Sequence, residues 1–409
     1  MSADSFDINA LLRPDLPPAA QRWTGYPKYN FVGGHNDAGS VPVDDLIAAV
    51  TTAMKREGDT LAMYGLHSGP LGYRPLREFI ARKLAKDAGI ACTADEVLIT
   101  SGSLQGLDLV NAVFLAKGDT AIVEEMTYSG TITRLQRLGV NVVGVPIDDD
   151  GLNANALAAT LADLKAKRVQ PKFIYTIPTV QNPTATVMST ARRREILRLS
   201  TEYGVPIFED ECYADLVWAG ERPQALRGMA GSDQVVHIGS FSKSIAPALR
   251  LGYLVASWPL MSRILSIKSD GGSGAIEQMM LAEYCSTHFD THVQALRKTL
   301  RAKVETLMSS LRAQFGGEVE FDDPAGGIFL WVRFPPAVDT TKLAQVALQA
   351  GVAVNPGAEW MTDADAGSRR VRICFAHPDP QTIREGVGRL AEICHREFGV
   401  PKRDAKAHR

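Results

Sequence analysis

Short apolar segments alternate with segments of helical length from Val97 onward, and no other feature of the sequence constrains the fold as strongly. The apolar segments are rich in valine and isoleucine, which favour strands. Nearly continuous apolar strands that alternate with helices are typical of a mainly parallel sheet with helices on both faces. The sequence therefore predicts an α/β fold. The expected strands cover 97–100, 120–123, 141–145, 172–177, 206–209, 234–238 and 251–256, and the expected helices between them cover 104–116, 129–138, 153–166 and 190–203.

The segments on either side of this region have a different character. Residues 1–30 are rich in proline and aromatic residues, which indicates an irregular arm. Helices are expected over 43–56 and 75–87, and Pro75 suits the first turn of the second one. A long amphipathic segment over 276–315 leads into a part of mixed α and β character. We therefore expect an N-terminal arm and small-domain segment at 1–62, a large domain at 63–305 and a smaller α+β domain at 306–409.

Composition and charge exclude several classes of protein. The chain has 409 residues, enough for two lobes, and a net charge of -2, which argues against a nucleic-acid partner. Its five cysteines form no C-x-x-C pair, as expected for reduced thiols in the cytoplasm. No window approaches about 18 apolar residues and no signal peptide is evident, so we expect a soluble cytoplasmic protein without a membrane partner. The basic segment 401–409 is interpreted as a solvated tail.

Two other patterns do not indicate a ligand. His288 and His292 have helical spacing, but the Glu of a zinc protease motif and a third ligand are both missing. We therefore expect surface histidines and no metal. The glycine-rich run 271–274 follows no clear strand and has no acidic ribose partner, which argues against a dinucleotide site.

The residues that follow the expected strands point to a common ligand site, because ligands of doubly wound sheets bind at the carboxyl ends of the strands. Ser103 opens a helix after the first strand, where free backbone N–H groups suit an anion. Tyr128 follows the second strand, and Asn182 stands before a proline after the fourth. Asp210 ends the fifth strand, with Tyr213 three residues later. Each residue alone also fits a cap, a turn or simple packing, but together they indicate one site.

The sixth expected strand leads into Ser240-Phe241-Ser242-Lys243, and Arg250 follows seven residues after the lysine. A lysine at the end of a buried strand should have a lowered pKa and a nucleophilic amine. The hydroxyls and the arginine beside it suit a phosphate group. Taken alone, the pattern also fits an exposed loop lysine.

These motifs in combination resemble the class I and II aminotransferases of fold type I, which depend on pyridoxal 5'-phosphate. The resemblance rests on Gln-Asn-Pro-Thr at 181–184, on Asp-x-x-Tyr from Asp210 to Tyr213, and on Ser-Phe-Ser-Lys ending at Lys243 with Arg250 beyond it. It is strongest for the branch of 2-aminoadipate, kynurenine and aromatic aminotransferases. It implies a large domain with a mainly parallel seven-stranded sheet, a smaller α+β domain, and a homodimer with shared active sites.

The resemblance also implies a role for each matching residue. Lys243 would form the Schiff base with the cofactor and shuttle the substrate proton. Asp210 would pair with the pyridine nitrogen and keep it protonated. Tyr213 and Asn182 would hydrogen-bond the phenolic oxygen of the ring, with Asn182 also facing the substrate. Tyr128 would stack on the ring.

The remaining roles concern the phosphate and the substrate. Ser240, Arg250 and the backbone at Ser103 and Leu104 would hold the phosphate. Arg372 would bind the α-carboxylate of the substrate with a bidentate fork.

Two residues would complete the site from outside this group. Gly34 would lie in the loop that closes over the substrate. Tyr64 would come from the neighbouring subunit and contact both cofactor and substrate. The sequence departs from the family pattern at Met126, where proline is usual, and at Ala185, where glycine is usual. His35-Asn36-Asp37 also departs from it and puts polar groups near the substrate mouth.

Four classes of function follow from these observations. The first is an aminotransferase that moves an amino group between an amino acid and a 2-oxo acid. The second uses the same cofactor but diverts the carbanion to elimination, replacement, C–C bond formation or oxidative deamination in biosynthesis. The third is a regulator that uses the fold as a sensor, which is disfavoured because the chain begins almost at the fold. The fourth, a nicotinamide dehydrogenase, lacks G-x-G-x-x-G after a strand. We expect the first and leave its amino acid substrate open.

Overall fold

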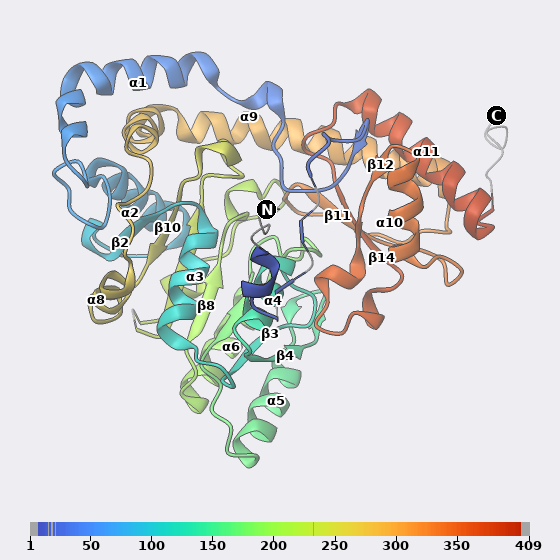
Figure 1. The fold of residues 1–409 in the computed structure, drawn as a ribbon, viewed down its shortest axis with the longest axis horizontal. Helices are drawn as coiled ribbons and strands as arrows, with labels where there is room; N and C mark the ends of the chain where they lie inside the picture. Colours follow the sequence, from blue (N-terminus) through green and yellow to red (C-terminus); the bar gives the residue numbers. More distant parts are fainter. Residues whose placement is uncertain (1–6, 15, 18, 21, 232, 402–409) are drawn as a thin grey trace, which may run out of the picture.

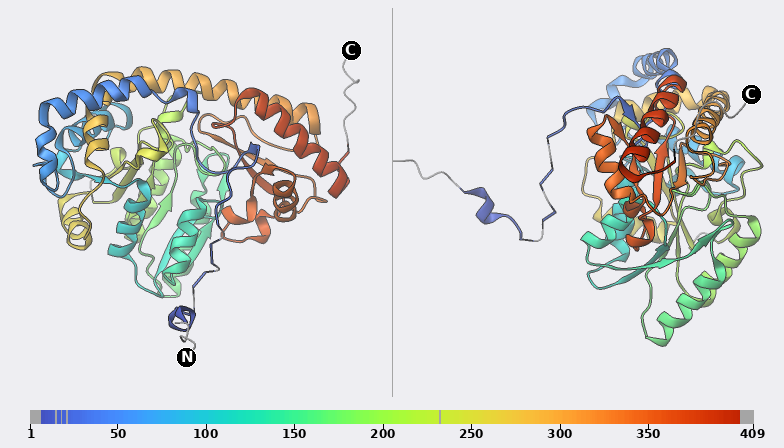
Figure 2. Two further views of the ribbon diagram at one scale, coloured as in Figure 1. Left: turned by 45° about the horizontal axis from the view of Figure 1, so that its top comes forward. Right: turned by 90° about the vertical axis from the view of Figure 1, so that its right-hand side faces the viewer.

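The computed structural model describes residues 7–14, 16–17, 19–20, 22–231 and 233–401 (Figure 1). Most of the expected basic tail and parts of the expected arm lie outside the described residues. Near the N-terminus the chain runs away from the body of the molecule (Figure 2), and most of its described residues there are exposed. This exposed segment contains one short turn of 3₁₀-helix at Ile8–Leu11.

A seven-stranded sheet forms the centre of the large part of the molecule. Its order is β2-β10-β9-β8-β7-β3-β4, and every neighbouring pair is parallel except the two made by β10. The predicted α/β fold with a mainly parallel seven-stranded sheet is therefore confirmed. The strands are β2 (Val97–Thr100), β3 (Thr120–Glu124), β4 (Asn141–Val145), β7 (Ile174–Thr176), β8 (Ile207–Asp210), β9 (Val235–Ser240) and β10 (Gly252–Val255).

Helices cover both faces of this sheet because alternate strand residues point to opposite sides. Tyr175 and Phe208 belong to one apolar core, which α3, α4 and α8 complete. Their neighbours Ile174 and Ile207 belong to another core, which α5, α6 and α7 complete. A third core joins the β2–β10 side of the sheet to α1, α2 and α9. The helices named here are α1 (Val43–Glu57), α2 (Arg74–Ala88), α3 (Ser103–Phe114), α4 (Ser129–Arg137), α5 (Ala154–Ala166), α6 (Thr190–Tyr203), α7 (Leu226–Met229), α8 (Trp258–Ile267) and α9 (Ala275–Phe315).

The C-terminal part has its own sheet and its own apolar core, and α9 extends from the large part into it (Figure 1). Its antiparallel sheet has the order β11-β14-β13, and a separate parallel pair joins β1 to β12. The end of the expected N-terminal arm is thus a strand of this part. The elements are β1 (Tyr29–Asn30), β11 (Phe329–Arg333), β12 (Val352–Ala353), β13 (Asn355–Pro356), β14 (Arg370–Cys374), α10 (Thr340–Gln349) and α11 (Pro380–Phe398).

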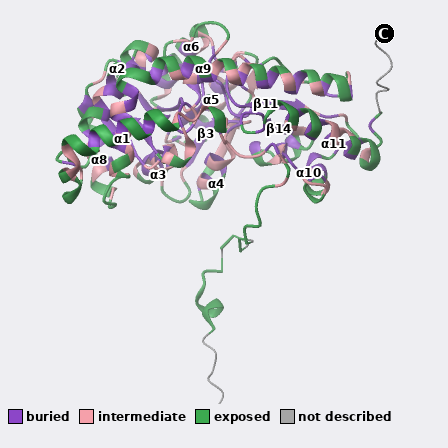
Figure 3. Cartoon of the chain, turned by 90° about the horizontal axis from the view of Figure 1, so that it is seen from above, coloured by how far each residue is buried: buried purple, intermediate pink, exposed green. Residues whose placement is uncertain are grey.

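Buried residues line the inner faces of these helices and strands, and exposed residues cover their outer faces (Figure 3). One short hairpin of β5 (Ile147–Asp148) and β6 (Gly151–Leu152) lies apart from both sheets. In the part of the chain that the structure describes, no helix combines the length and apolar character needed to cross a membrane. The five cysteines are free thiols.

The expectation of two surface histidines in α9 is wrong for one of them. His288 is exposed, but His292 is half-buried, and its Nε2 lies 2.8 Å from the carbonyl oxygen of Ser244. The reason is that this side of α9 packs against the turn after β9. Among the described residues, no group of three or more His, Cys, Asp or Glu side chains is arranged to hold a metal ion.

Candidate active site

One cavity of about 320 Å³ lies where the predicted site residues converge. It opens at the carboxyl ends of the parallel strands, and it receives residues from the loop after β1 and from β14. All the residues expected from the sequence line this cavity except Tyr64. They are Gly34, Ser103, Leu104, Tyr128, Asn182, Asp210, Tyr213, Ser240, Lys243, Arg250 and Arg372.

Lys243 follows β9 and points its amine into the cavity. Its Nζ donates a hydrogen bond to the carbonyl oxygen of Gly34 at 2.7 Å. Burial lowers the pKa of Lys243 to about 8, and the positive charges of Arg372 and Arg250 act in the same direction. The direction of this shift agrees with the prediction from the sequence. A β-carbon added to Gly34 would meet the amine, so any larger residue here would displace the side chain of Lys243.

Asp210 ends β8 and is 5% exposed. Its Oδ2 accepts a hydrogen bond from the hydroxyl of Tyr175 at 2.7 Å, and its Oδ1 accepts one from the backbone N–H of Cys212 at 3.1 Å. No Lys, Arg or His of the described residues forms an ion pair with this carboxylate. A buried, unpaired carboxylate is costly, so it is suited to a ligand group that carries a positive charge.

Arg372 on β14 lies across the cavity and is 4% exposed. Its guanidinium donates to Asn182 Oδ1 at 3.2 Å, to Gly33 O at 2.9 Å and to Asn355 Oδ1 at 3.1 Å. The ring of Trp360 covers one face, with its centroid 3.8 Å from Cζ. Nε has no hydrogen-bond partner, and no carboxylate of the described residues pairs with this cation. The arrangement leaves the guanidinium ready for an anionic ligand.

Asn182 connects Arg372 to the opposite wall. Its amide donates to the hydroxyl of Tyr213 at 3.4 Å. Burial raises the pKa of Tyr213 well above its usual value, so the hydroxyl keeps its proton near neutral pH. The Nζ of Lys243 lies 5.9 Å from the centroid of the Tyr213 ring.

The N-terminus of α3 and Arg250 form the cationic end of the cavity. Gly102 precedes α3 with φ of 76°, and a β-carbon there would collide with the guanidinium of Arg250. Among the described residues, Arg250 donates only to carbonyl oxygens, those of Pro247 at 3.1 Å and Ser101 at 3.4 Å. Free N–H groups at a helix N-terminus beside an arginine form a seat for a phosphate.

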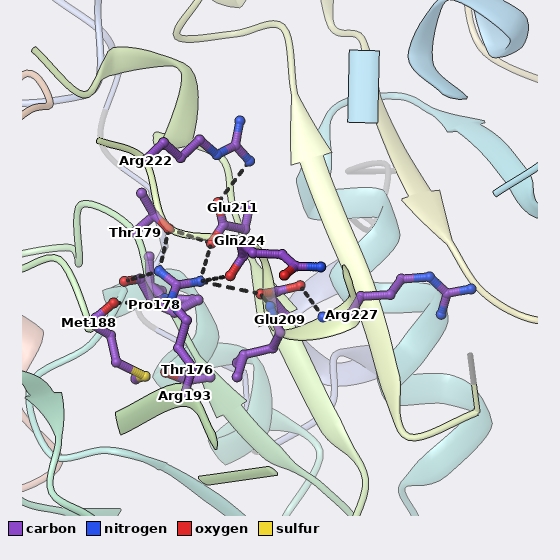
Figure 4. A network of polar contacts seen from close by, with 12 residues as sticks. Thr176, Pro178, Thr179, Met188, Arg193, Glu209, Glu211, Arg222, Gln224 and Arg227 are labelled. Atoms are coloured by element: carbon purple, nitrogen blue, oxygen red, sulfur yellow. Dashed lines mark hydrogen bonds and ion pairs between the residues drawn. The ribbon is translucent and has the colours of Figure 1, made fainter. Parts of the chain in front are cut away.

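A buried network lies next to the loops that carry Asn182 and Asp210 (Figure 4). Arg193 on α6 is 0% exposed and lies 3.9 Å from Glu209 and 3.5 Å from Glu211, the residues on either side of Asp210. Its guanidinium also donates to Thr179 Oγ1 at 2.7 Å. This network ties the end of β8 to the loop after β7.

The residue expected from a neighbouring subunit lies away from this cavity. Tyr64 is 92% exposed and lines a second cavity of about 790 Å³, opposite the segment that contains Gly271. Within one chain it therefore contacts none of the residues described above.

Comparison with known proteins identifies the family. A family model described as aminotransferase class I and II matches residues 36–390. The chain belongs to this family. A 2-aminoadipate transaminase of Thermus thermophilus is 31% identical over 366 residues, which are 88% of this chain and 88% of that protein. The structure of a kynurenine aminotransferase from Pyrococcus horikoshii matches with a TM-score of 0.85 at 29% identity, covering 92% of each chain.

The same comparison finds relatives described as regulators. An uncharacterized HTH-type transcriptional regulator of Bacillus subtilis, YisV, is 31% identical over 330 residues, which are 80% of this chain and 66% of the regulator. The family of this chain, its fold type I and its use of pyridoxal phosphate are nonetheless as the sequence motifs predicted. The chain is an aminotransferase that transfers an amino group between amino and oxo acids.

The cavity of this aminotransferase fits pyridoxal phosphate. The unpaired carboxylate of Asp210 suits a protonated pyridine nitrogen, and the seat beside Arg250 suits the phosphate. The amine of Lys243 lies between them in the same cavity. The guanidinium of Arg372, which no carboxylate of the described residues pairs with, suits a further anionic group.

Sequence reasoning missed several residues of this cavity. Trp360 and Asn355 line it, but they come from the short strand β13 and the 3₁₀-helix Gly357–Trp360, far along the chain, where neither has a distinctive spacing. Tyr175 stands inside an apolar strand, so its hydroxyl could not be assigned to Asp210 from the sequence. Cys212 could have been found, because it lies between Asp210 and Tyr213 in a recognised motif.

Proposed function

We propose that the residues of this cavity carry out the amino-group transfer. The observation that supports this most strongly is the shared cavity of three groups, the amine of Lys243, the carboxylate of Asp210 and the guanidinium of Arg372. An amine, an acid and a carboxylate clamp in one small space are what the reaction requires.

When bound, the cofactor supplies an electron sink for the bond that breaks at the substrate α-carbon. Asp210 keeps a proton on the pyridine nitrogen, which increases the electron demand of the ring. Lys243 would hold the cofactor covalently at rest. Once the amine of the substrate has taken its place, the freed lysine amine would move the proton away from the substrate α-carbon. Its lowered pKa keeps part of the amine neutral near pH 8. Tyr213 and Asn182 donate to the phenolic oxygen.

The substrate is held by its α-carboxylate. Arg372 binds this group, and Asn182 and Trp360 fix the plane of the guanidinium. Ser240, Arg250 and the N–H groups of Ser103 and Leu104 would hold the phosphate, and Tyr128 would stack on the ring. Gly34 forms the wall nearest the substrate.

The protein is proposed to work as a cytoplasmic homodimer with shared active sites in the biosynthesis of amino-acid-derived compounds. Large apolar side chains are exposed on α1 and just after it, which supports a partner surface there. Val43, Ile47 and Met63 are 56%, 57% and 55% exposed. Tyr64 projects from the same region and would reach the site of the second subunit. We also propose that the chain divides into an N-terminal arm and small-domain segment at 1–62, a large domain at 63–305 and a small domain at 306–409. The boundary between the last two falls within α9.

Half-reaction spectroscopy tests the proposed chemistry. A stoichiometric amino acid should convert the holoenzyme to its pyridoxamine form, and a 2-oxo acid should return it to the starting spectrum. A panel of amino acids with different side chains would identify the donor. If no donor produces this cycle, and products of elimination or replacement accumulate instead, the second class of function holds.

A further inference from the structure

The loop that carries Asn182 has little regular structure of its own. It joins β7 to α6, and a single bridge pairs Thr179 with Val187. Two of its non-glycine residues, Val180 and Ala185, have left-handed φ values of 58° and 64°. Such conformations are strained for residues with a β-carbon, so contacts outside the loop must hold its shape.

Glu124 at the end of β3 provides such contacts and is 0% exposed. Its Oε1 accepts hydrogen bonds from Thr176 Oγ1 at 2.5 Å and from the N–H of Ile177 at 3.1 Å. Its Oε2 accepts one from Gln181 Nε2 at 2.9 Å. No cation of the described residues pairs with this carboxylate. Glu124 therefore joins β3 to the end of β7 and to the loop through hydrogen bonds alone.

Gln181 uses both ends of its amide. Besides Glu124, its Nε2 donates to the carbonyl oxygen of Met126 at 2.6 Å. Its Oε1 accepts from the N–H and the hydroxyl of Thr184 at 3.0 and 2.8 Å. The amide thus fixes the turn around Asn182 and ties it to the segment after β3.

Two residues that contact the guanidinium of Arg372 are connected to the side-chain amide of Gln181. Asn182, the residue after Gln181, accepts from Arg372 on one side. Trp360 covers a face of the same guanidinium, and its carbonyl oxygen accepts from the N–H of Thr127 at 2.9 Å. Thr127 directly follows Met126, whose carbonyl oxygen accepts the hydrogen bond from Gln181.

We propose that Glu124 and Gln181 are positioning residues that set the guanidinium of Arg372 for the α-carboxylate of the substrate. They act through Asn182 on one side and through the segment that carries Thr127 on the other. The inference rests on the proposed role of Arg372.

Glu124→Gln tests the inference with little change in shape. The NH₂ group of the new glutamine must face a hydrogen-bond donor, either Gln181 Nε2 or the N–H of Ile177. Two donors repel each other, so we expect the loop to shift. For an amino acid donor we expect kcat/KM to fall at least about tenfold, mainly through KM. The comparison substrate is the amine that has the same side chain as this amino acid but no α-carboxylate. For this amine, kcat/KM of the variant should stay within about threefold of the wild-type value. The Kd of the holoenzyme for propionate, followed by its spectrum, should rise about tenfold.

Gln181→Ala provides a second test that keeps every ionisable group. It should give the same selective loss, and the double variant should lose little more than the worse single variant, because the two residues act as one unit. Glu209→Gln is the matched control. Glu209 is also fully buried, but its hydrogen bonds join the N–H groups of Leu226 and Arg227 and the Nδ1 of His237, away from the loop of Asn182. Glu209→Gln should therefore lower stability without changing the ratio of the two donors.

Equal losses for the amino acid and the amine in Glu124→Gln and Gln181→Ala would overturn the inference. Additive losses in the double variant would also overturn it. A wild-type enzyme that transfers no amino group would instead contradict the proposed function. The two failures are therefore distinguishable.

Discussion

Single residues of the cavity carry charges that the described part of the protein does not neutralise. Asp210 and Arg372 are buried without an opposite charge, and Lys243 is held by a backbone carbonyl. Leaving a buried charge unpaired costs several kcal/mol, so these residues are poorly explained by stability. A ligand with one cationic and several anionic groups explains them.

The pKa of Lys243 gives a prediction about cofactor capture. The neutral amine is the nucleophile, and burial places the pKa near 8, so the neutral fraction rises about tenfold between about pH 7 and pH 9. We expect the rate at which the cofactor-free protein captures pyridoxal phosphate to rise by the same factor, measured by stopped-flow absorbance. Nα-acetyl-lysine is the control, since its rate should keep rising to about pH 10. A protein rate that follows this control would contradict the lowered pKa.

Individual elements hold these residues at fixed places. The start of α3 provides a direct test, because Gly102 stands where a β-carbon would enter the space of Arg250. We expect Gly102→Ala to weaken cofactor binding at least about tenfold, measured by absorbance titration of the cofactor-free protein. Gly118→Ala is the control, since Gly118 also has a positive φ of 89° but no atom near its missing β-carbon. Equal effects of both changes would show that backbone strain, rather than the phosphate seat, matters.

The buried network between α6 and β8 gives a prediction about stability. Arg193→Met leaves Glu209 and Glu211 without the cation between them, and breaking a buried pair costs about 3–5 kcal/mol. We expect a loss of this size in the free energy of unfolding, measured with urea. Arg198→Met, in the exposed pairs of the same helix, should cost less than about 1 kcal/mol. A loss below about 1 kcal/mol for Arg193→Met would mean that water or a shifted side chain replaces the arginine.

The elements also show what could be predicted from the sequence. The seven strands were predictable because the strands of a sheet covered on both faces are short and nearly continuously apolar. The residues at their ends could be grouped by a topological rule. Trp360 and Asn355 could not be placed in this way. They reach the cavity because α9 brings a separate sheet beside the first one. A contact between two sheets leaves no pattern in the local sequence. Glu124 was hidden for a similar reason, since its partners come from β7 and the following loop.

At the scale of the whole molecule, the exposed Tyr64 leads to a test of shared active sites. A mixture of Lys243→Ala and Tyr64→Ala subunits should form hybrids with one intact site, made of Lys243 from one chain and Tyr64 from the other. Each variant alone should be nearly inactive. Random assortment should restore about a quarter of the wild-type activity after the subunits are mixed and reassembled. If mixing restores nothing while co-purification of differently tagged subunits shows that hybrids form, each site is built from one chain.

The central claim is that Lys243 holds the cofactor. Borohydride reduction of the holoenzyme, followed by digestion and mass spectrometry, tests it most directly. We expect the phosphopyridoxyl label on the peptide that contains Lys243, and no covalent label in Lys243→Ala, although that variant should still bind the cofactor through Asp210 and Arg250. A label on any other lysine of the wild-type enzyme would contradict the claim.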